Sequence, residues 1–356
     1  MTKSKTDYDV IIIGGGQAGL ATAYYMKRIG LNFLILDAEK KPGGAWLHTW
    51  DSLRLFSPAS YSSLPGLQIP QENSEIFPGR EDVINYFTRY EQRYEFEIVR
   101  PVKINQIKSE NNRLIVISED GRSWITRSVV SATGTWRQPY TPIYKGQESY
   151  KGEQTHSAHY RSPDSYKGKR VIVVGGGNSG AQILAELSKV ADTTWVTLQD
   201  PVFLPDDVDG RVLFERATAR VKGKVDDKQP IGGIGDIVMT QSVKNARDRG
   251  VLTSVRPFMA FIKTGVIWPN SSEEVAHAIL WCTGFRPALS HLESLGVVGV
   301  EGKVDLKQYQ SIKEPRLWLI GYGDWVGAAS ATIIGASRTA REMSSRLSAW
   351  LVENNL

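Results

Sequence analysis

"VIIIGGGQAG", residues 10–19, and "VIVVGGGNSG", residues 171–180, decide the fold, because the chain uses one pattern twice. In both stretches, four β-branched apolar residues precede a glycine cluster, which is typical of a buried parallel strand followed by a tight turn. A helix-forming segment comes next, and then a second apolar run, 32–37 in the first copy and 194–200 in the second. Each copy therefore predicts a strand–turn–helix–strand unit. Together they predict an α/β fold with two Rossmann-like dinucleotide-binding domains.

The first glycine cluster has the spacing of a dinucleotide-binding fingerprint. Its first glycine allows the tight turn, its second lets a pyrophosphate approach the backbone, and its third lets the helix pack on the strand. The free N–H groups at the helix start then face the phosphates. Asp37, at the end of the second run, can accept hydrogen bonds from a ribose. The candidate binding residues here are Gly14, Gly16, Gln17, Ala18, Gly19 and Asp37.

The second cluster repeats the fingerprint, so two dinucleotides are expected. Its candidate residues are Gly175, Gly177, Asn178, Ser179 and Gly180, with Gln199 and Asp200 at the end of the following strand. A chemical reason for such a pair is hydride transfer from a nicotinamide to a flavin. Asp324, in "GYGDW" at 321–325, lies between a predicted strand and the terminal helix, where a chain returns to a flavin. The first site is therefore assigned to FAD and the second to NADH or NADPH.

This assignment places the NAD(P) domain inside the FAD domain. The expected ranges are 1–150 for the first part of the FAD-binding domain, 151–285 for the NAD(P)-binding domain and 286–356 for the FAD-binding return segment. A chain of 356 residues is long enough for about two domains.

Composition excludes several function classes. Lys plus Arg is 43 against 38 for Asp plus Glu, and this small excess is spread along the chain, so no nucleic-acid partner is expected. The single cysteine, Cys282, excludes the cysteine pair of a disulfide reductase. The five histidines show no metal-binding spacing, so no metal is expected. The polar N-terminus and the short apolar runs indicate a cytoplasmic protein that does not enter a membrane.

Several further motifs give the chain a specific resemblance. "YKGEQTHSAHY", residues 150–160, matches Phe-x-Gly-x-x-x-His-x-x-x-Phe/Tyr through Tyr150, Gly152, His156 and Tyr160, with Tyr in the first position. "GGAW" at 43–46, "ATG" at 132–134 and "CTGF" at 282–285 match segments of the same family. Over essentially its whole length the chain resembles the flavin-containing monooxygenases in their short bacterial form, which are class B flavoprotein monooxygenases. It more distantly resembles the Baeyer–Villiger monooxygenases.

The resemblance implies a reaction and a wider set of site residues. NAD(P)H reduces FAD, and O2 then adds to give a C4a-(hydro)peroxyflavin. This species oxygenates a small organic substrate, a sulfide or an amine, with some Baeyer–Villiger oxidation of ketones. The residues that the resemblance adds to the cofactor sites are Gly44, Trp46, Val102, Thr133 and Gly134, with Phe56 and His156 as catalytic candidates. His156 has an equal alternative as a structural histidine. The oligomeric state stays open, a homodimer included.

One departure from the family pattern concerns how tightly NAD(P)H consumption is coupled to oxygenation of the substrate. Many members carry an Asn at the flavin edge, but "LRLFSPASYSSLPG", 53–66, has none, and Phe56 is placed at that position. The loss implies a shorter-lived oxygenated flavin and use of NADH as well as NADPH. The anionic Asp200, close to the ribose, favours NADH for a second reason. An NAD(P)H oxidase that releases peroxide, or a redox-responsive flavin-binding protein, remains the alternative.

Overall fold

The computed structural model describes residues 7–70, 77–213, 215 and 236–354, which form two compact units. The first unit contains 1–47, 58–138 and 286–356, and the second contains 48–57 and 139–285. The domain ranges expected from the sequence remain a prediction about where each cofactor binds. A helix that the sequence predicts around Val212–Arg220 extends largely outside the described residues.

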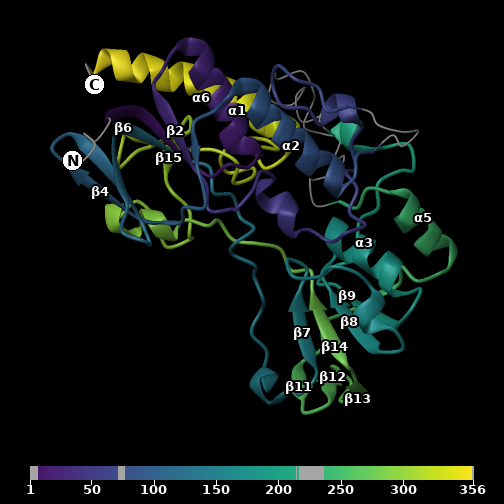
Figure 1. Ribbon diagram of the computed structural model, residues 1–356. Helices are drawn as coiled ribbons and strands as arrows, with labels where there is room; N and C mark the ends of the chain where they lie inside the picture. Colours follow the sequence, from purple (N-terminus) through teal and green to yellow (C-terminus); the bar gives the residue numbers. More distant parts are fainter. Residues whose placement is uncertain (1–6, 71–76, 214, 216–235, 355–356) are drawn as a thin grey trace. The chain divides into compact units, whose positions relative to one another are not determined.

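A nine-stranded sheet forms the centre of the first unit (Figure 1). The central strands follow the order β17-β6-β1-β2-β3 and are all parallel, and β4 and β5 extend from β6 as antiparallel neighbours. The strands are β1 (Asp7–Ile13), β2 (Phe33–Leu36), β3 (Ile98–Val99), β4 (Ile104–Glu110), β5 (Arg113–Ser118), β6 (Ser123–Ser131), β15 (Leu306–Lys307), β16 (Gln310–Ser311) and β17 (Leu317–Leu319). The helices are α1 (Gln17–Ile29), α2 (Arg80–Tyr94) and α6 (Ile333–Glu353), with short 3₁₀ turns at Gly44–His48, Ala59–Tyr61 and Ser290–Leu295.

The second unit contains a smaller parallel sheet with the order β10-β9-β8-β14-β7 and a separate antiparallel meander (Figure 1). Its strands are β7 (Glu153–His156), β8 (Arg170–Val174), β9 (Asp192–Val196), β10 (Ser254–Val255), β11 (Ala260–Ile262), β12 (Gly265–Ile267), β13 (Glu273–Val275) and β14 (Ala278–Trp281). Its described helices are α3 (Asn178–Leu187) and α5 (Gln241–Asp248), with 3₁₀ turns at Gln147–Ser149 and Asp164–Tyr166. The expected α/β fold with two Rossmann-like sheets is confirmed.

Both sheets place a strand–glycine–helix unit where the strand order reverses. In the first unit, β1 has β2 on one side and β6 on the other, and in the second unit β8 has β9 and β14 as neighbours. Ligands of open parallel sheets bind beyond the carboxyl ends of the strands at such a point. The apolar runs of both central strands are buried, as expected of strands covered on both faces.

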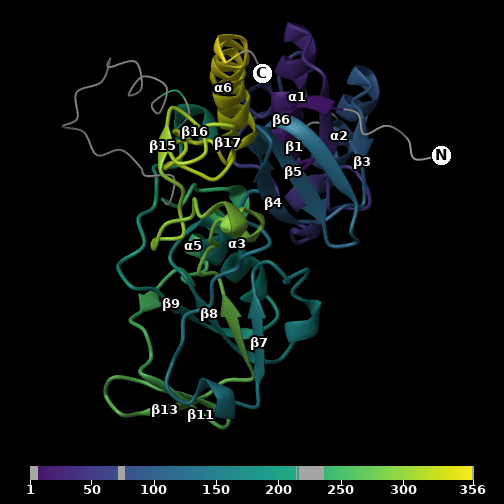
Figure 2. The same cartoon turned by 90° about the vertical axis from the view of Figure 1, so that its left-hand side faces the viewer.

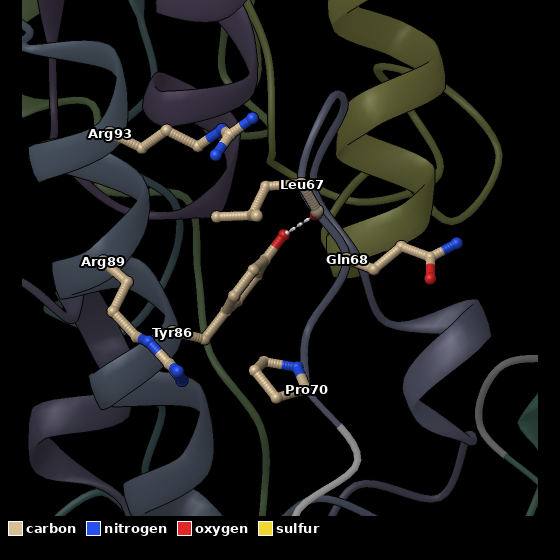
Figure 3. A pocket seen from close by; sticks show the side chains of 6 residues that line it. All are labelled: Leu67, Gln68, Pro70, Tyr86, Arg89 and Arg93. Atoms are coloured by element: carbon tan, nitrogen blue, oxygen red, sulfur yellow. Dashed lines mark hydrogen bonds between the residues drawn. The ribbon is translucent and has the colours of Figure 1, made fainter.

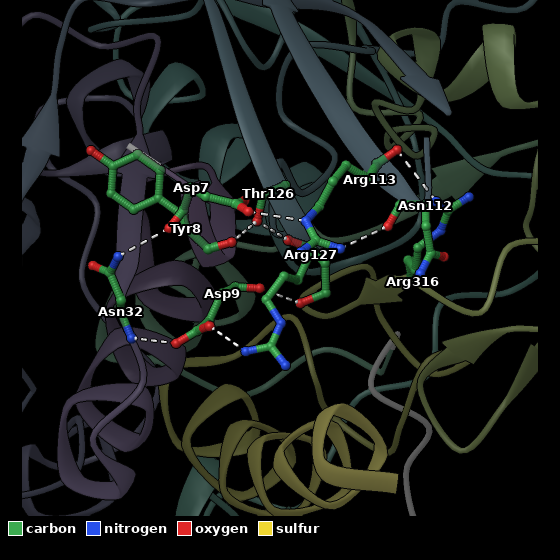
Figure 4. A network of polar contacts seen from close by, with 10 residues as sticks. Asp7, Tyr8, Asp9, Asn32, Asn112, Arg113, Thr126, Arg127 and Arg316 are labelled. Atoms are coloured by element: carbon green, nitrogen blue, oxygen red, sulfur yellow. Dashed lines mark hydrogen bonds and ion pairs between the residues drawn. The ribbon is translucent and has the colours of Figure 1, made fainter. Parts of the chain in front are cut away.

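A polar network fastens the opposite, amino end of β1 (Figure 4). Arg127 Nη1 donates to Asp9 Oδ1 at 2.6 Å, and Arg113 Nε donates to Asp7 Oδ2 at 3.1 Å. The Asn32 backbone N–H donates to the second oxygen of Asp9 at 2.9 Å. Since ligands meet the carboxyl end of the sheet, we interpret this network as structural.

One predicted boundary was wrong. The strand expected over 194–200 ends at Val196, so Gln199 and Asp200 lie in the loop beyond it. The pairing of β9 with β10 stops at Val196 opposite Val255, and the chain then turns outward with Leu198 exposed. A strand continues only where a neighbour supplies hydrogen bonds, which an apolar run alone does not reveal.

Candidate functional site: two glycine loops

In the first loop, packing requires Gly14 and Gly19 but leaves Gly16 open. Gly14 has φ +111°, and a Cβ there would lie 2.5 Å from the Ala132 carbonyl oxygen. A Cβ on Gly19 would lie 1.9 Å from the Gly14 oxygen. At Gly16, by contrast, the nearest atom to a Cβ is the Gly44 Cα at 3.9 Å. Space that the protein leaves empty above a backbone is what an approaching pyrophosphate needs.

The start of α1 is suited to an anion. Gly16 is the N-cap residue, no side chain caps the helix, and its first turn contains no acidic residue. The first N–H groups of the helix therefore have no capping side chain, and the helix dipole favours negative charge here. A Cβ on Gly44 would meet the Gly16 Cα at 2.7 Å, so the "GGAW" segment lies directly against the loop. This arrangement fits the pyrophosphate of a dinucleotide.

Gln17 joins three parts of the first site. Its Oε1 accepts from the Trp46 indole N–H at 2.9 Å, and its Nε2 donates to the Ala331 oxygen at 2.7 Å. Ala331 lies just before α6, whose N-cap Thr332 accepts from the Gly335 N–H. A Cβ on Gly321 would lie 2.6 Å from the Cβ of Ala18. The "GGAW", "GYGDW" and α6 segments therefore converge on the first turn of α1.

Asp37 is buried beside the loop and is already hydrogen-bonded. Its Oδ2 accepts from Arg100 Nε and Nη2 at 3.1 and 2.8 Å, and its Oδ1 accepts from the Glu39 N–H at 3.3 Å. Burial raises the pKa of Asp37, while the Arg100 guanidinium acts in the opposite direction. The buried Val102 donates its N–H to the Asp37 carbonyl at 2.7 Å, which places the two candidates side by side. Arg100 could not be identified from the sequence.

A buried chain of hydroxyls and one imidazole lies at the "ATG" and "GYGDW" segments. His291 Nε2 contacts Ser131 Oγ at 2.9 Å, and Ser131 Oγ contacts the Tyr322 hydroxyl at 2.5 Å. Tyr322 in turn contacts Thr133 Oγ1 at 2.7 Å, and Thr133 donates to the Ala288 oxygen at 2.7 Å. Burial lowers the pKa of His291 to about 4, so this imidazole is neutral at pH 7. This series of hydrogen bonds could not be predicted from the sequence, because its members lie far apart along the polypeptide.

Gly134 and Asp324 are the two remaining candidates in the first unit, and each accepts a hydrogen bond from a backbone N–H group. Gly134 has φ +63°, and its carbonyl accepts from the Ala288 N–H at 2.9 Å. Asp324 Oδ1 accepts from the Ala329 N–H at 3.0 Å, which closes the loop before α6.

The second loop repeats the geometry of the first. Gly175 has φ +136°, and a Cβ there would lie 2.2 Å from the Cys282 oxygen. A Cβ on Gly180 would lie 2.1 Å from the Gly175 oxygen. Gly177 is the N-cap of α3, without a capping side chain or an acidic residue in the first turn. Trp195, which the sequence analysis did not select, donates its indole N–H to the Gly175 oxygen at 2.8 Å.

Two of the second-site candidates differ in their environment. Asn178 uses its side chain inside the protein: Nδ2 donates to the Asp236 oxygen at 2.8 Å, and Oδ1 accepts from the Val238 N–H at 2.9 Å. Asn178 therefore anchors the segment before α5. Ser179, in the first turn of α3, is half-buried.

The end of β9 brings a cation beside Asp200. Gln199 and Asp200 are exposed, and Asp200 Oδ1 accepts from Arg256 Nη2 at 2.8 Å. Arg256 follows β10, the parallel neighbour of β9. Asp200 is therefore paired with a cation and is not an isolated anion. Arg256 escaped sequence analysis because strand pairing, which a single sequence does not show, places it there.

His156 is buried, and both of its ring nitrogens are engaged. Nε2 lies 3.0 Å from the Gly284 oxygen, and Nδ1 accepts from the Ala158 N–H at 3.0 Å. Nε2 must therefore carry the proton, and the ring is a neutral imidazole. Burial lowers the pKa of His156, while the hydrogen bond to the Gly284 oxygen acts in the opposite direction. These contacts tie β7 to the "CTGF" segment and favour the structural alternative for His156.

Phe56 lies in the second unit. Its carbonyl accepts from the Gly210 N–H at 2.7 Å, and its side chain packs on a small apolar cluster of Leu204, Val208 and Val238. A Cβ on Gly210 would lie 2.8 Å from the Phe56 ring and from Ser57 Cβ. Its place near a flavin stays a prediction.

A cavity of 220 Å³ opens beside α2 (Figure 3). Its lining residues are Leu67, Gln68, Pro70, Tyr86, Arg89 and Arg93, and the Tyr86 hydroxyl donates to the Leu67 oxygen at 2.6 Å. None of the candidate residues contributes to it, and it is smaller than the roughly 300–1,000 Å³ of typical ligand pockets. We therefore do not assign a cofactor to it.

The described residues contain neither a candidate metal cluster nor a helix that could span a membrane. No group of three or more His, Cys, Asp or Glu side chains in these ranges could hold a metal ion. No helix within the same ranges has the length and apolar character needed to cross a membrane.

Comparisons with known proteins agree with this geometry. A family model described as pyridine nucleotide-disulphide oxidoreductase matches residues 11–224. The solved flavin-containing monooxygenase from Stenotrophomonas maltophilia is 48% identical, with a TM-score of 0.89 over 97% of this chain and 99% of that chain. The uncharacterized oxidoreductase CzcO from Bacillus subtilis is 32% identical over 83% of this chain and 87% of its own length. Senecionine N-oxygenase from Tyria jacobaeae is 24% identical over 88% of this chain and 66% of its own length.

Proposed function

Because this chain belongs to the bacterial flavin-containing monooxygenases, within the pyridine nucleotide-disulphide oxidoreductase family, we propose that it oxygenates sulfides and amines. It is an FAD-dependent enzyme that uses a reduced nicotinamide cofactor and O2. One observation carries the proposal: Gly16 has no packing reason to be glycine, so its open Cβ position is kept for a ligand. Support for amines comes from the senecionine N-oxygenase among its relatives. Some Baeyer–Villiger oxidation of ketones belongs to the same proposal.

The chain's own residues would bind and orient the cofactors. When bound, FAD accepts a hydride from the nicotinamide and activates O2. The uncapped N-terminus of α1 would hold the FAD pyrophosphate, and that of α3 the nicotinamide pyrophosphate. Gln17 would keep Trp46 and the α6 N-terminus in place, where the helix dipole favours negative charge on the reduced flavin.

We also propose that NADH and NADPH both serve as reductants. Asp200 would accept from the ribose diol of NADH, while Arg256 beside it would reduce the repulsion of a 2′-phosphate. Both side chains are exposed, so water and salt screen their charges. The ratio of kcat/KM for NADH to that for NADPH should therefore be smaller than the roughly 10- to 100-fold that an isolated Asp200 would give.

Product formation per NADH consumed tests the function. Purified protein is given NADH, O2 and an aryl alkyl sulfide, with catalase present so that free peroxide cannot oxidise the sulfide. We expect sulfoxide, together with peroxide release in a parallel assay without catalase, because Phe56 replaces a hydrogen-bonding Asn. NADH consumption with peroxide as the sole product would instead identify an oxidase. A Gly16→Val variant serves as the control without bound flavin.

Location and assembly are part of the proposal as well. We expect a cytoplasmic protein, which cell fractionation can check. A homodimer is the assembly we would test first, by light scattering of the purified holoenzyme.

A further inference from the structure

Three charged side chains form a compact cluster beneath the first glycine loop. Arg100 lies between two carboxylates: its Nε and Nη2 donate to Asp37 Oδ2, and its Nη1 and Nη2 donate to Glu91 at 2.6 and 2.8 Å. The three come from separate elements, since Asp37 follows β2, Glu91 lies in α2 and Arg100 follows β3. Four of the five N–H donors of Arg100 are therefore used on carboxylates.

Burying these three charged groups is energetically unfavourable, because each loses its hydration. The exposed fractions of the Asp37, Arg100 and Glu91 side chains are 5%, 13% and 10%. Two carboxylates and one guanidinium leave a net charge of −1, and a buried charge needs compensation. Glu91 also lies in the last turn of α2, where the helix dipole disfavours an anion. Such an arrangement is typical of a site that serves a ligand rather than packing.

The cluster directly contacts the loop that would receive the dinucleotide. A Cβ on Gly15 would lie 2.6 Å from Asp37 Oδ2 and 2.9 Å from Arg100 Nη2. Gly15 therefore lacks a side chain because of the cluster, whereas Gly16, the next residue, faces open space. The same guanidinium therefore holds the Asp37 carboxylate and lies close to the position that a Gly15 side chain would occupy.

We propose that Arg100, itself held by Glu91, is a positioning residue for the adenosine half of FAD. Arg100 opposes the effect of burial on the pKa of Asp37 and holds the carboxylate against Gly15, so that the ribose meets a preorganised acceptor. Glu91 acts one step further away by fixing the guanidinium plane. The inference rests on the proposed assignment of the first loop to FAD.

The test measures the FAD dissociation constant of Arg100→Lys and Glu91→Gln holoenzymes. Each protein is diluted serially, and free FAD is determined by fluorescence after ultrafiltration. Lys cannot bridge both carboxylates in one plane, so we expect the dissociation constant to rise about tenfold, and less for Glu91→Gln. ADP carries the adenosine and pyrophosphate without the flavin. Its dissociation constant, measured by competition with FAD, should rise by the same factor.

Arg316→Lys is the matched control. Arg316 pairs with Glu314 in the same unit, and the exposed fractions of these side chains are 14% and 12%. The control should lower the melting temperature as an ion-pair change does, without altering FAD or ADP affinity. If Arg100→Lys and Glu91→Gln match Arg316→Lys in FAD affinity, the proposal is overturned. Glu91→Gln keeps the test valid should Arg100→Lys fail to fold.

A Gly16→Val variant separates this inference from the proposed function. Full flavin content in Gly16→Val would refute the assignment of the first loop. Loss of flavin in Gly16→Val, together with unchanged affinity in Arg100→Lys, would refute only the role of Arg100.

Discussion

The neutral, buried His291 predicts a measurable loss of stability in mild acid. In the unfolded chain this imidazole takes up a proton below pH 6.5, whereas in the folded protein it does so only below about pH 4. Between these values the unfolded state binds more protons, so the free energy of unfolding falls as the pH falls. Going from pH 7 to pH 5 should remove about 2 kcal/mol through His291 alone.

The assay compares wild type with His291→Gln. Gln can still hydrogen-bond to Ser131 but does not titrate, so the other ionisable groups cancel in the difference between the two proteins. We expect the melting temperature of the wild type to fall by ~2–3 °C more than that of the variant between pH 7 and pH 5. Equal losses in the two proteins would refute the neutral, buried state of His291.

Four substitutions probe the two loops and α6. Gly16→Val should fold but lose its yellow flavin absorbance, because the new side chain fills the space beside Gly44; retention of one FAD per chain would contradict the loop assignment. Asp200→Asn should release Arg256 and raise kcat/KM for NADPH up to about tenfold at low salt, and Arg256→Gln should lower the NADPH value. The NADH value should fall only slightly in Asp200→Asn, because the amide oxygen can still accept from the ribose diol. A wild-type preference for NADPH above tenfold would count against our reading of this pair. Thr332→Val should remove the N-cap of α6 and cost about 1 kcal/mol in urea unfolding, whereas an unchanged midpoint would show that the cap contributes little.

The sequence was most informative where structure depends on near neighbours. Gly14, Gly16 and Gly19 could be assigned roles because a strand, a turn and a helix follow one another within a few residues. Gly30 likewise ends α1 as its C-cap in the left-handed conformation, a role that glycine commonly has directly after a helix. The second copy was predictable for the same reason.

Contacts between residues far apart along the chain could not be predicted from the sequence. Arg100 is 63 positions from Asp37, and Arg256 is 56 positions from Asp200, so only the folded sheets bring each pair together. The end of β9 was misplaced because the pairing partner, not the residue type, ends that strand. The two nitrogens of His156 could be assigned only once Gly284 and Ala158 were placed around the ring.

The polar network at the amino end of β1 has a practical consequence for engineering. Asp7, Asp9, Arg113 and Arg127 hold the sheet at the end away from the glycine loops (Figure 4). Mutant libraries that seek heat tolerance can be confined to this end, where a tighter ion pair leaves the cofactor-facing end undisturbed. Libraries that seek new substrates can then start from a scaffold with stability in reserve, since most activity-altering substitutions are destabilising.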